Sequence, residues 1–171
     1  MARLIRQLGT RGRSARCGWI PGSISLLLAG AALGAVSITA PSGQTRTHDT
    51  ADAPQSFAEQ RWNLGSTELL GATVQLSAGP FVHATRPSVK ADCKLNLRVV
   101  SSSLLSGWVA VVPLDQTNVA LGKQSAAVTA RSAAVGDATV GLTVTLENSD
   151  FSTLGSGNYS TTVTGTIVPN L

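Results

Sequence analysis

Alternation of apolar and polar residues is the feature that most constrains how this chain can fold. Ala72, Val74 and Leu76 alternate with polar residues, and the same period of two returns further along the chain. Such a period directs one face of a β-strand toward a core and the other toward solvent. No useful length of chain after residue 60 carries the 3.6-residue period of an amphipathic helix. The pattern therefore predicts an all-β domain.

Short strands separated by turn residues are predicted along this whole region. Clusters of Gly, Pro, Asn, Asp and Ser break the alternating runs every 8–15 residues or so, as roughly expected for a sandwich or a barrel. The run 108–114 is apolar on both faces and predicts a central strand. Residues 126–135 also suit a helix by propensity, but their Val and Thr content favours a strand. The predicted strands are 72–77, 81–84, 94–99, 108–114, 124–131, 140–147 and 158–168.

The first 40 residues differ in composition from the rest. They contain five arginines and no acidic residue, and residues 20–40 carry no charge. A basic region followed by an apolar region and small residues is the layout of a secretory signal peptide. The uncharged stretch is also long enough to cross a bilayer core of about 30 Å. We predict an apolar targeting helix within residues 1–40, either a cleaved signal peptide or a retained anchor.

The cleavage position is open between three residues. Ala40 ends a run of small residues, but Pro41 directly after it disfavours cleavage there. Ala35 and Ser37 are the other candidates, since small residues are required at such sites.

Residues 41–60 are predicted to be a flexible polar linker, followed by a β-sandwich domain over 61–171. Phe57 is the one large apolar residue of the linker, which is too few to offset the entropy of ordering it. The net charge of +4 comes from the leader, because residues 41–171 contain eight basic and nine acidic residues. A nearly neutral domain with few aromatics excludes a nucleic-acid-binding role. Membrane contact is expected only through residues 20–40, if they are retained.

The sequence shows no motif of an enzyme, a cofactor site or a metal site. No G-x-S-x-G, H-E-x-x-H or phosphate-binding glycine loop occurs. Cys93 is the one cysteine beyond the leader, so we expect a small buried residue rather than a reactive thiol or an intermolecular disulfide. We therefore predict that the chain is not an enzyme and has no cofactor and no metal.

Two alternatives would give the domain a chemical site. A catalytic site would have to be assembled from His83, Asp92 and Asp115, which are far apart in sequence. A calcium site would use hard oxygen ligands, although their spacing does not fit an EF-hand. Its candidates are Asp137, Glu147, Asn148 and Asp150.

Aromatic residues are the candidates for ligand contact. A sugar-binding module presents exposed rings, and Trp62 and Tyr159 are the residues that could provide them. Trp108 lies in an apolar run, where core packing is the better interpretation. A bound glycan is thus the alternative to a purely structural role.

The C-terminal stretch 155–167, GSGNYSTTVTGTI, resembles the end of bacterial pilin and spore-coat-protein-U-like domains. The resemblance lies in a glycine turn, Tyr159 shortly after it and a terminal Thr/Val strand. It implies an Ig-like antiparallel β-sandwich of about seven strands with a structural role at the cell surface, often through donor-strand exchange. Residues 41–60 lack the alternating apolar residues that such subunits donate.

These observations predict an exported, non-enzymatic structural or adhesion protein, secreted or at the cell surface. Its partners would be other envelope proteins or further copies of itself. The alternative is an envelope module that binds a carbohydrate or another ligand.

Overall fold

The computed structural model describes residues 34–47, 53–148 and 150–171 of the chain. Within these ranges the structure is all-β and antiparallel, with one 3-10 turn at Phe151–Thr153 and no α-helix. The predicted fold class is confirmed at this level. The targeting helix was predicted mainly over residues that lie outside the described ranges.

Strands account for most of the described chain. The strands are β1 (Val36–Thr39), β2 (Gln55–Ser56), β3 (Gln60–Ser66), β4 (Ala72–Ala78), β5 (Phe81–His83), β6 (Lys90–Ser102), β7 (Val109–Val112), β8 (Leu114–Gln116), β9 (Ala126–Arg131), β10 (Gly136–Glu147), β11 (Tyr159–Ser160) and β12 (Val163–Pro169). Residues 126–131 form a strand, as favoured over a helix.

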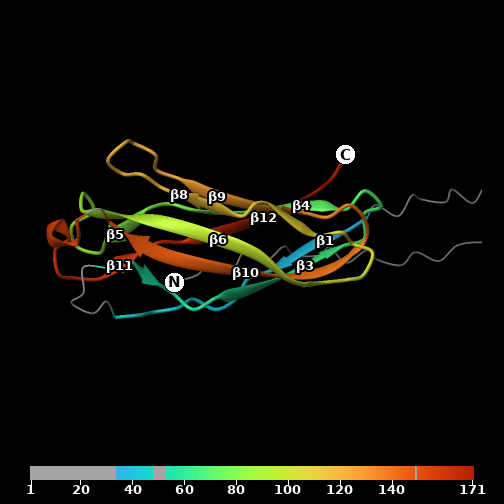
Figure 1. The fold of residues 1–171 in the computed structure, drawn as a ribbon, viewed down its shortest axis with the longest axis horizontal. Coiled ribbons are helices and arrows are strands. Elements are labelled where there is room, and N and C mark those ends of the chain that lie inside the picture. Colours follow the sequence, from blue (N-terminus) through green and yellow to red (C-terminus); the bar gives the residue numbers. More distant parts are fainter. Residues whose placement is uncertain (1–33, 48–52, 149) are drawn as a thin grey trace, which may run out of the picture. The chain divides into compact units, whose positions relative to one another are not determined.

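The strands form two sheets that face each other (Figure 1). The larger sheet has the order β1-β3-β10-β6-β5-β11, with β2 also paired to β10 and β8 to β6. The smaller sheet has the order β12-β4-β9-β7. This is the layered arrangement of a β-sandwich, in which each sheet buries one face against the other.

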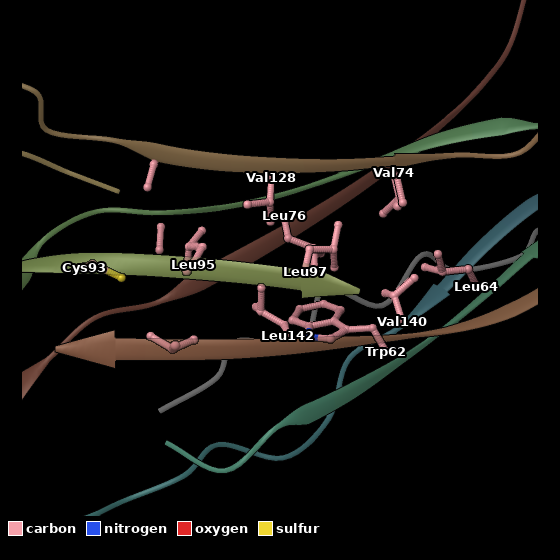
Figure 2. Packing of buried hydrophobic residues seen from close by; sticks show 14 of the residues in the cluster. Trp62, Leu64, Val74, Leu76, Cys93, Leu95, Leu97, Val128, Val140 and Leu142 are labelled. Carbon is pink, nitrogen blue, oxygen red and sulfur yellow. The ribbon is translucent and has the colours of Figure 1, made fainter. Parts of the chain in front are cut away.

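The core between the sheets is made by the residues whose alternation predicts strands. Leu97 and Leu142 are paired across β6 and β10, and both are buried. Val74, Leu76 and Val128 cover them from the opposite sheet (Figure 2). Polar neighbours on the same strands face outward, because successive strand residues point to opposite faces.

Strand β7 differs from its prediction. Residues 108–114 were expected to form a central strand, but β7 is an edge strand of the smaller sheet and pairs only with β9. Val109, Val111 and Val112 are exposed there. The prediction was wrong because a strand that is apolar on both faces can also lie at the edge of a sheet, where it has a neighbouring strand on one side only. Only Trp108, just before the strand, is buried as expected.

The N-terminal part of the domain begins earlier than residue 61. Strand β1 pairs with β3 from Val36↔Ser66 to Thr39↔Asn63, so its residues lie inside the predicted targeting segment. Ile38 packs with Trp62 over Gly165 of β12, where a Cβ would come within 2.8 Å of both side chains. The glycine therefore makes room for β1.

The predicted linker also contributes to the domain. Strand β2 pairs with β10, and Phe57 packs against the core and stacks on Phe81 with 5.9 Å between ring centroids. A single aromatic residue is enough to fix this part of residues 41–60, because it buries a large apolar area.

Candidate functional site

Trp62 lies inside the sandwich rather than on its surface. Its side chain is only 5 % exposed, and it extends from β3 toward Leu142 in the core (Figure 2). Its indole nitrogen has no hydrogen-bond partner among the described residues. A ring in this position cannot present a platform to a sugar, so Trp62 acts as a core residue.

Tyr159 lies at the start of β11 and is half-buried. Its hydroxyl donates to the Gly155 carbonyl at 3.0 Å, and its ring meets the His83 ring edge-on at 5.0 Å between centroids. Strand β11 places it there by pairing Tyr159 with His83 of β5. Both polar and aromatic parts of Tyr159 are thus used to hold the 155–159 turn.

His83 is buried and all of its ring nitrogens have partners. Nδ1 accepts from the backbone N–H groups of Thr85 at 3.2 Å and Arg86 at 3.1 Å. Nε2 lies 3.1 Å from the Ser156 carbonyl oxygen and 3.2 Å from Arg86 Nη2. A Cβ on Gly157 would collide with this imidazole, and Gly157 has φ +148. Its positive φ fits the turn predicted for this glycine-rich stretch.

Asp92 holds a loop in place. Its Oδ1 accepts from the Thr117 hydroxyl and from the Val119 N–H, both at 2.8 Å. The Thr117 hydroxyl in turn accepts from the Cys93 N–H at 2.9 Å, and Thr117 is fully buried. The chain after β8 is therefore fastened to β6 by one carboxylate and one hydroxyl.

Asp115 has a similar structural role at the start of the same loop. It forms an ion pair with Lys123 and accepts from the Ala127 N–H at 2.9 Å. Burial raises the pKa of Asp115, but the hydrogen bonds from Lys123, Ala127 and Gln116 outweigh it and hold the pKa below its usual value. No hydrogen bond joins His83, Asp92 and Asp115 to one another within the described part of the chain, so the structure does not assemble them into a hydrogen-bonded set.

Of the predicted calcium ligands, Asp137 lies far from the other three. Asp137 and Glu147 lie near opposite ends of β10, about 33 Å apart at the usual rise of a strand. Glu147 is paired with Lys94 at 2.9 Å. Asp150 accepts from Ser152 and caps the 3-10 turn. Among the described residues, no group of three or more His, Cys, Asp or Glu side chains could hold a metal ion.

Two of the surface hollows of the described chain are shallow and open. One, of about 300 Å³, is lined by Phe57, Arg46 and their neighbours. The other, of about 310 Å³, lies over β1, β3 and β10, with Asn63, Asp137 and small side chains around it. Neither contains a pair of titratable groups in hydrogen-bond contact, so neither has the geometry of acid–base catalysis.

The structure also contains no helix, in its described ranges, that could cross a membrane.

Cys93 is fully buried, as predicted for a small core residue, and is a free thiol. Burial raises the pKa of the Cys93 thiol to about 12, and the Asp92 carboxylate adds to the rise. A neutral, inaccessible thiol is a poor nucleophile.

We expect Cys93 to resist alkylation in the native protein at pH 8 and to react fully once the chain is unfolded. Since the folded-state pKa is raised, the thiol also destabilises the fold as pH rises from about 9 toward 12. Iodoacetamide labelling of a Cys17→Ser variant, followed by intact mass, measures this. Rapid stoichiometric labelling of the folded chain would contradict it.

The exposed apolar residues were not singled out from the sequence. They include the valines of β7 and two Leu-Leu pairs, Leu69-Leu70 and Leu104-Leu105. The sequence does contain a signal for the two pairs. Each pair lies among Ser, Thr and Gly residues that indicate a turn, and the central positions of a turn normally carry polar side chains.

Comparison with known proteins gives no further assignment. No protein-family model, curated protein or solved structure matches this chain.

Proposed function

We propose that this chain is an exported, non-enzymatic β-sandwich protein that acts in cell-surface structure or adhesion. The observation that carries this function is the contrast between its engaged polar side chains and its exposed apolar side chains. His83, Asp92 and Asp115 are all engaged in holding loops. The exposed features that need a partner are apolar, and apolar patches mark contact surfaces rather than reaction sites.

An Ig-like arrangement is supported by the pairing of the inner strands. The order β4-β9-β7 in one sheet and the β6-β10 pair in the other match the B-E-D and C-F strands of an Ig domain. The outer strands differ, since β3 lies beside β10 and β12 lies beside β4. We infer an Ig-like sandwich whose first and last long strands have exchanged sheets.

The edge strand β7 is the element best suited to association with another chain. It ends the smaller sheet, and its valines are between 40 % and 57 % exposed. An unpaired edge offers backbone groups for strand addition, and apolar side chains there increase the tendency. A bulge between Ala110 and Val112, and Pro113 after it, restrict such pairing to a short segment.

We expect Val112→Lys to weaken self-association at least about tenfold, since a charge on an edge strand opposes pairing. Envelope extracts from the native host, analysed by native electrophoresis and sedimentation, should contain an assembly larger than one chain. Leu121→Lys is the matched control, because Leu121 is an exposed residue of a loop rather than of a sheet edge. A wild-type protein that is strictly monomeric and cytosolic would contradict the proposed function.

A further inference from the structure

Two turns at one end of the sandwich carry leucine at both of their central positions. Gly71 N–H donates to the Glu68 carbonyl at 2.9 Å, which encloses Leu69 and Leu70. Ser106 N–H donates to the Ser103 carbonyl at 3.1 Å, which encloses Leu104 and Leu105. The central positions of such turns normally carry Gly, Pro, Asn, Asp or Ser, so two Leu-Leu turns depart from the usual chemistry.

These leucines project into solvent. Leu104 is 99 % exposed, Leu69 and Leu105 are each 83 % exposed and Leu70 is 60 % exposed. Single exposed apolar residues are common, but a group of four at one end needs an explanation. Residues that break the usual turn preferences without adding packing inside the domain are expected at functional sites.

Hydrogen bonds hold the two turns at the same end of the domain. Asn170 Nδ2 donates to the carbonyls of Leu70 and Ser132, both at 2.8 Å. The loop after Ser132 then joins the other turn, because Ala133 N–H donates to the Ser106 carbonyl at 3.0 Å. We call the two Leu-Leu turns together the leucine tip. It lies at the right-hand end of the sandwich in Figure 1.

The charge of the leucine tip does not suit a protein or nucleic-acid ligand of high charge. Glu68 is the one charged side chain within residues 66–71 and 101–107, and no basic residue occurs in either range. The remaining residues of these turns are mostly Ser, Thr and Gly. The leucines are flanked by small hydroxyl residues and by Glu68, so they can enter the interface of a neutral bilayer while the Glu68 carboxylate stays among the headgroups.

The chain enters the domain at this same tip. Thr67 N–H donates to the Ala35 carbonyl at 2.9 Å, and the Thr67 hydroxyl accepts from the Ala35 N–H at 2.6 Å. A Cβ added to Gly34 would lie within 2.6 Å of both carboxylate oxygens of Glu68, so Gly34 and Glu68 are in direct contact. The uncharged sequence before Gly34 is therefore joined to the domain beside the Leu69-Leu70 turn.

The uncharged sequence is too short to both span a bilayer and separate the domain from it. Arg16 is the last charged residue before the domain, so 17 uncharged residues separate it from Gly34. As a helix they would rise about 26 Å, at 1.5 Å per residue. A bilayer core is about 30 Å thick, so a chain held by this segment would have its first sheet residues at the membrane surface.

We propose that the leucine tip docks on a lipid bilayer, with Leu69, Leu70, Leu104 and Leu105 inserted at the interface. The occupant follows from the uncharged segment that joins the domain at the tip. Docking gives the domain a fixed orientation, with the loop that contains Leu121 directed away from the membrane. This goes beyond the proposed function, and it concerns the chain that keeps its uncharged segment.

The test uses the full chain reconstituted in phosphatidylcholine vesicles and a fluorophore at defined positions. Leu105→Cys or Leu121→Cys, each in a Cys17→Ser background, is labelled with NBD; buried Cys93 does not need replacing. Leu121 is the matched control, since it is also 83 % exposed and lies in a turn closed by Gly122 N–H and the Val119 carbonyl. Acyl-chain-brominated phosphatidylcholine then reports contact with lipid.

We expect NBD at position 105 to shift to the blue and to be quenched by the brominated lipid, and NBD at position 121 to do neither. Adding Leu69→Ser and Leu70→Ser should remove most of the quenching at 105, although the uncharged segment is unchanged. Equal quenching at both positions, or none at 105, would overturn the proposal. A blue shift without bromolipid quenching would also overturn it, because the tip would then be covered by protein, either a second copy or the chain's own segment.

Processing of the leader and docking can be separated. A cytosolic location of the native protein would contradict export but would leave the vesicle result standing. Absence of quenching at position 105 would contradict docking and leave the export proposal untouched.

Discussion

Leu142→Ala is expected to lower the free energy of unfolding by about 2–5 kcal/mol. Leu142 is fully buried at the centre of β10 and packs beside Trp62 and Leu97 (Figure 2). β10 is paired with both β3 and β6, so the sheet cannot close around the cavity without disturbing two ladders. Urea denaturation followed by tryptophan fluorescence measures the change.

Leu121→Ala is the control for this loss. It removes the same atoms from an exposed side chain, so the expected change in the free energy of unfolding is within about 0.5 kcal/mol. Equal effects of the two substitutions would contradict the placement of Leu142 in the core.

Gly71→Ala is expected to cost about 3 kcal/mol or more, because strain and a collision add together. Gly71 has φ +75, which disfavours any residue with a Cβ by about 1–2 kcal/mol. A Cβ there would also come within 2.5 Å of the Ser132 carbonyl oxygen, a backbone atom that accepts a hydrogen bond from Asn170 Nδ2. Thermal unfolding measures the loss as a lower Tm.

Gly122→Ala separates the two causes. Gly122 has nearly the same φ, +80, but nothing lies within 4 Å of the Cβ that it would carry. This variant should therefore show only the backbone cost of about 1–2 kcal/mol. If both alanine variants lost the same stability, the close approach of Gly71 to Ser132 would be refuted.

The strands that bury one face could be predicted from the sequence. In β4 and β10 the apolar residues alternate strictly enough that burial follows from the order of residues alone. The edge position of β7 could not be predicted, because it depends on which strands pair across the sheet. Long-range pairing of this kind leaves no local signal when a strand is apolar on both faces.

Strand β1 was missed for a different reason. Val36 and Ile38 do alternate with polar residues, but they follow directly on the uncharged leader and were assigned to it. Their role becomes visible only through Gly165, which provides space for Ile38 from the far end of the chain.

The candidate site residues differ in how well the sequence predicts their place in the structure. Cys93, the lone cysteine beyond the leader, is expected to be a small buried residue, and it is buried. The sequence does not decide between core and surface for Trp62, because a tryptophan at the start of a domain fits either place. The use of Asp92 and Asp115 as loop anchors depends on Thr117, Val119 and Ala127, whose backbone positions the sequence does not encode locally.

The N-terminus and intact mass of the protein from its native host, with cell fractionation, test the proposed export most directly. We expect the protein in the envelope or secreted fraction, with a first residue at or before Val36, because β1 belongs to the sheet. Of the three cleavage positions considered, only that after Ala35 leaves β1 whole. An intact N-terminus in the cytosol would contradict export, and a mature start at or after Ile38 would contradict the structural role of β1.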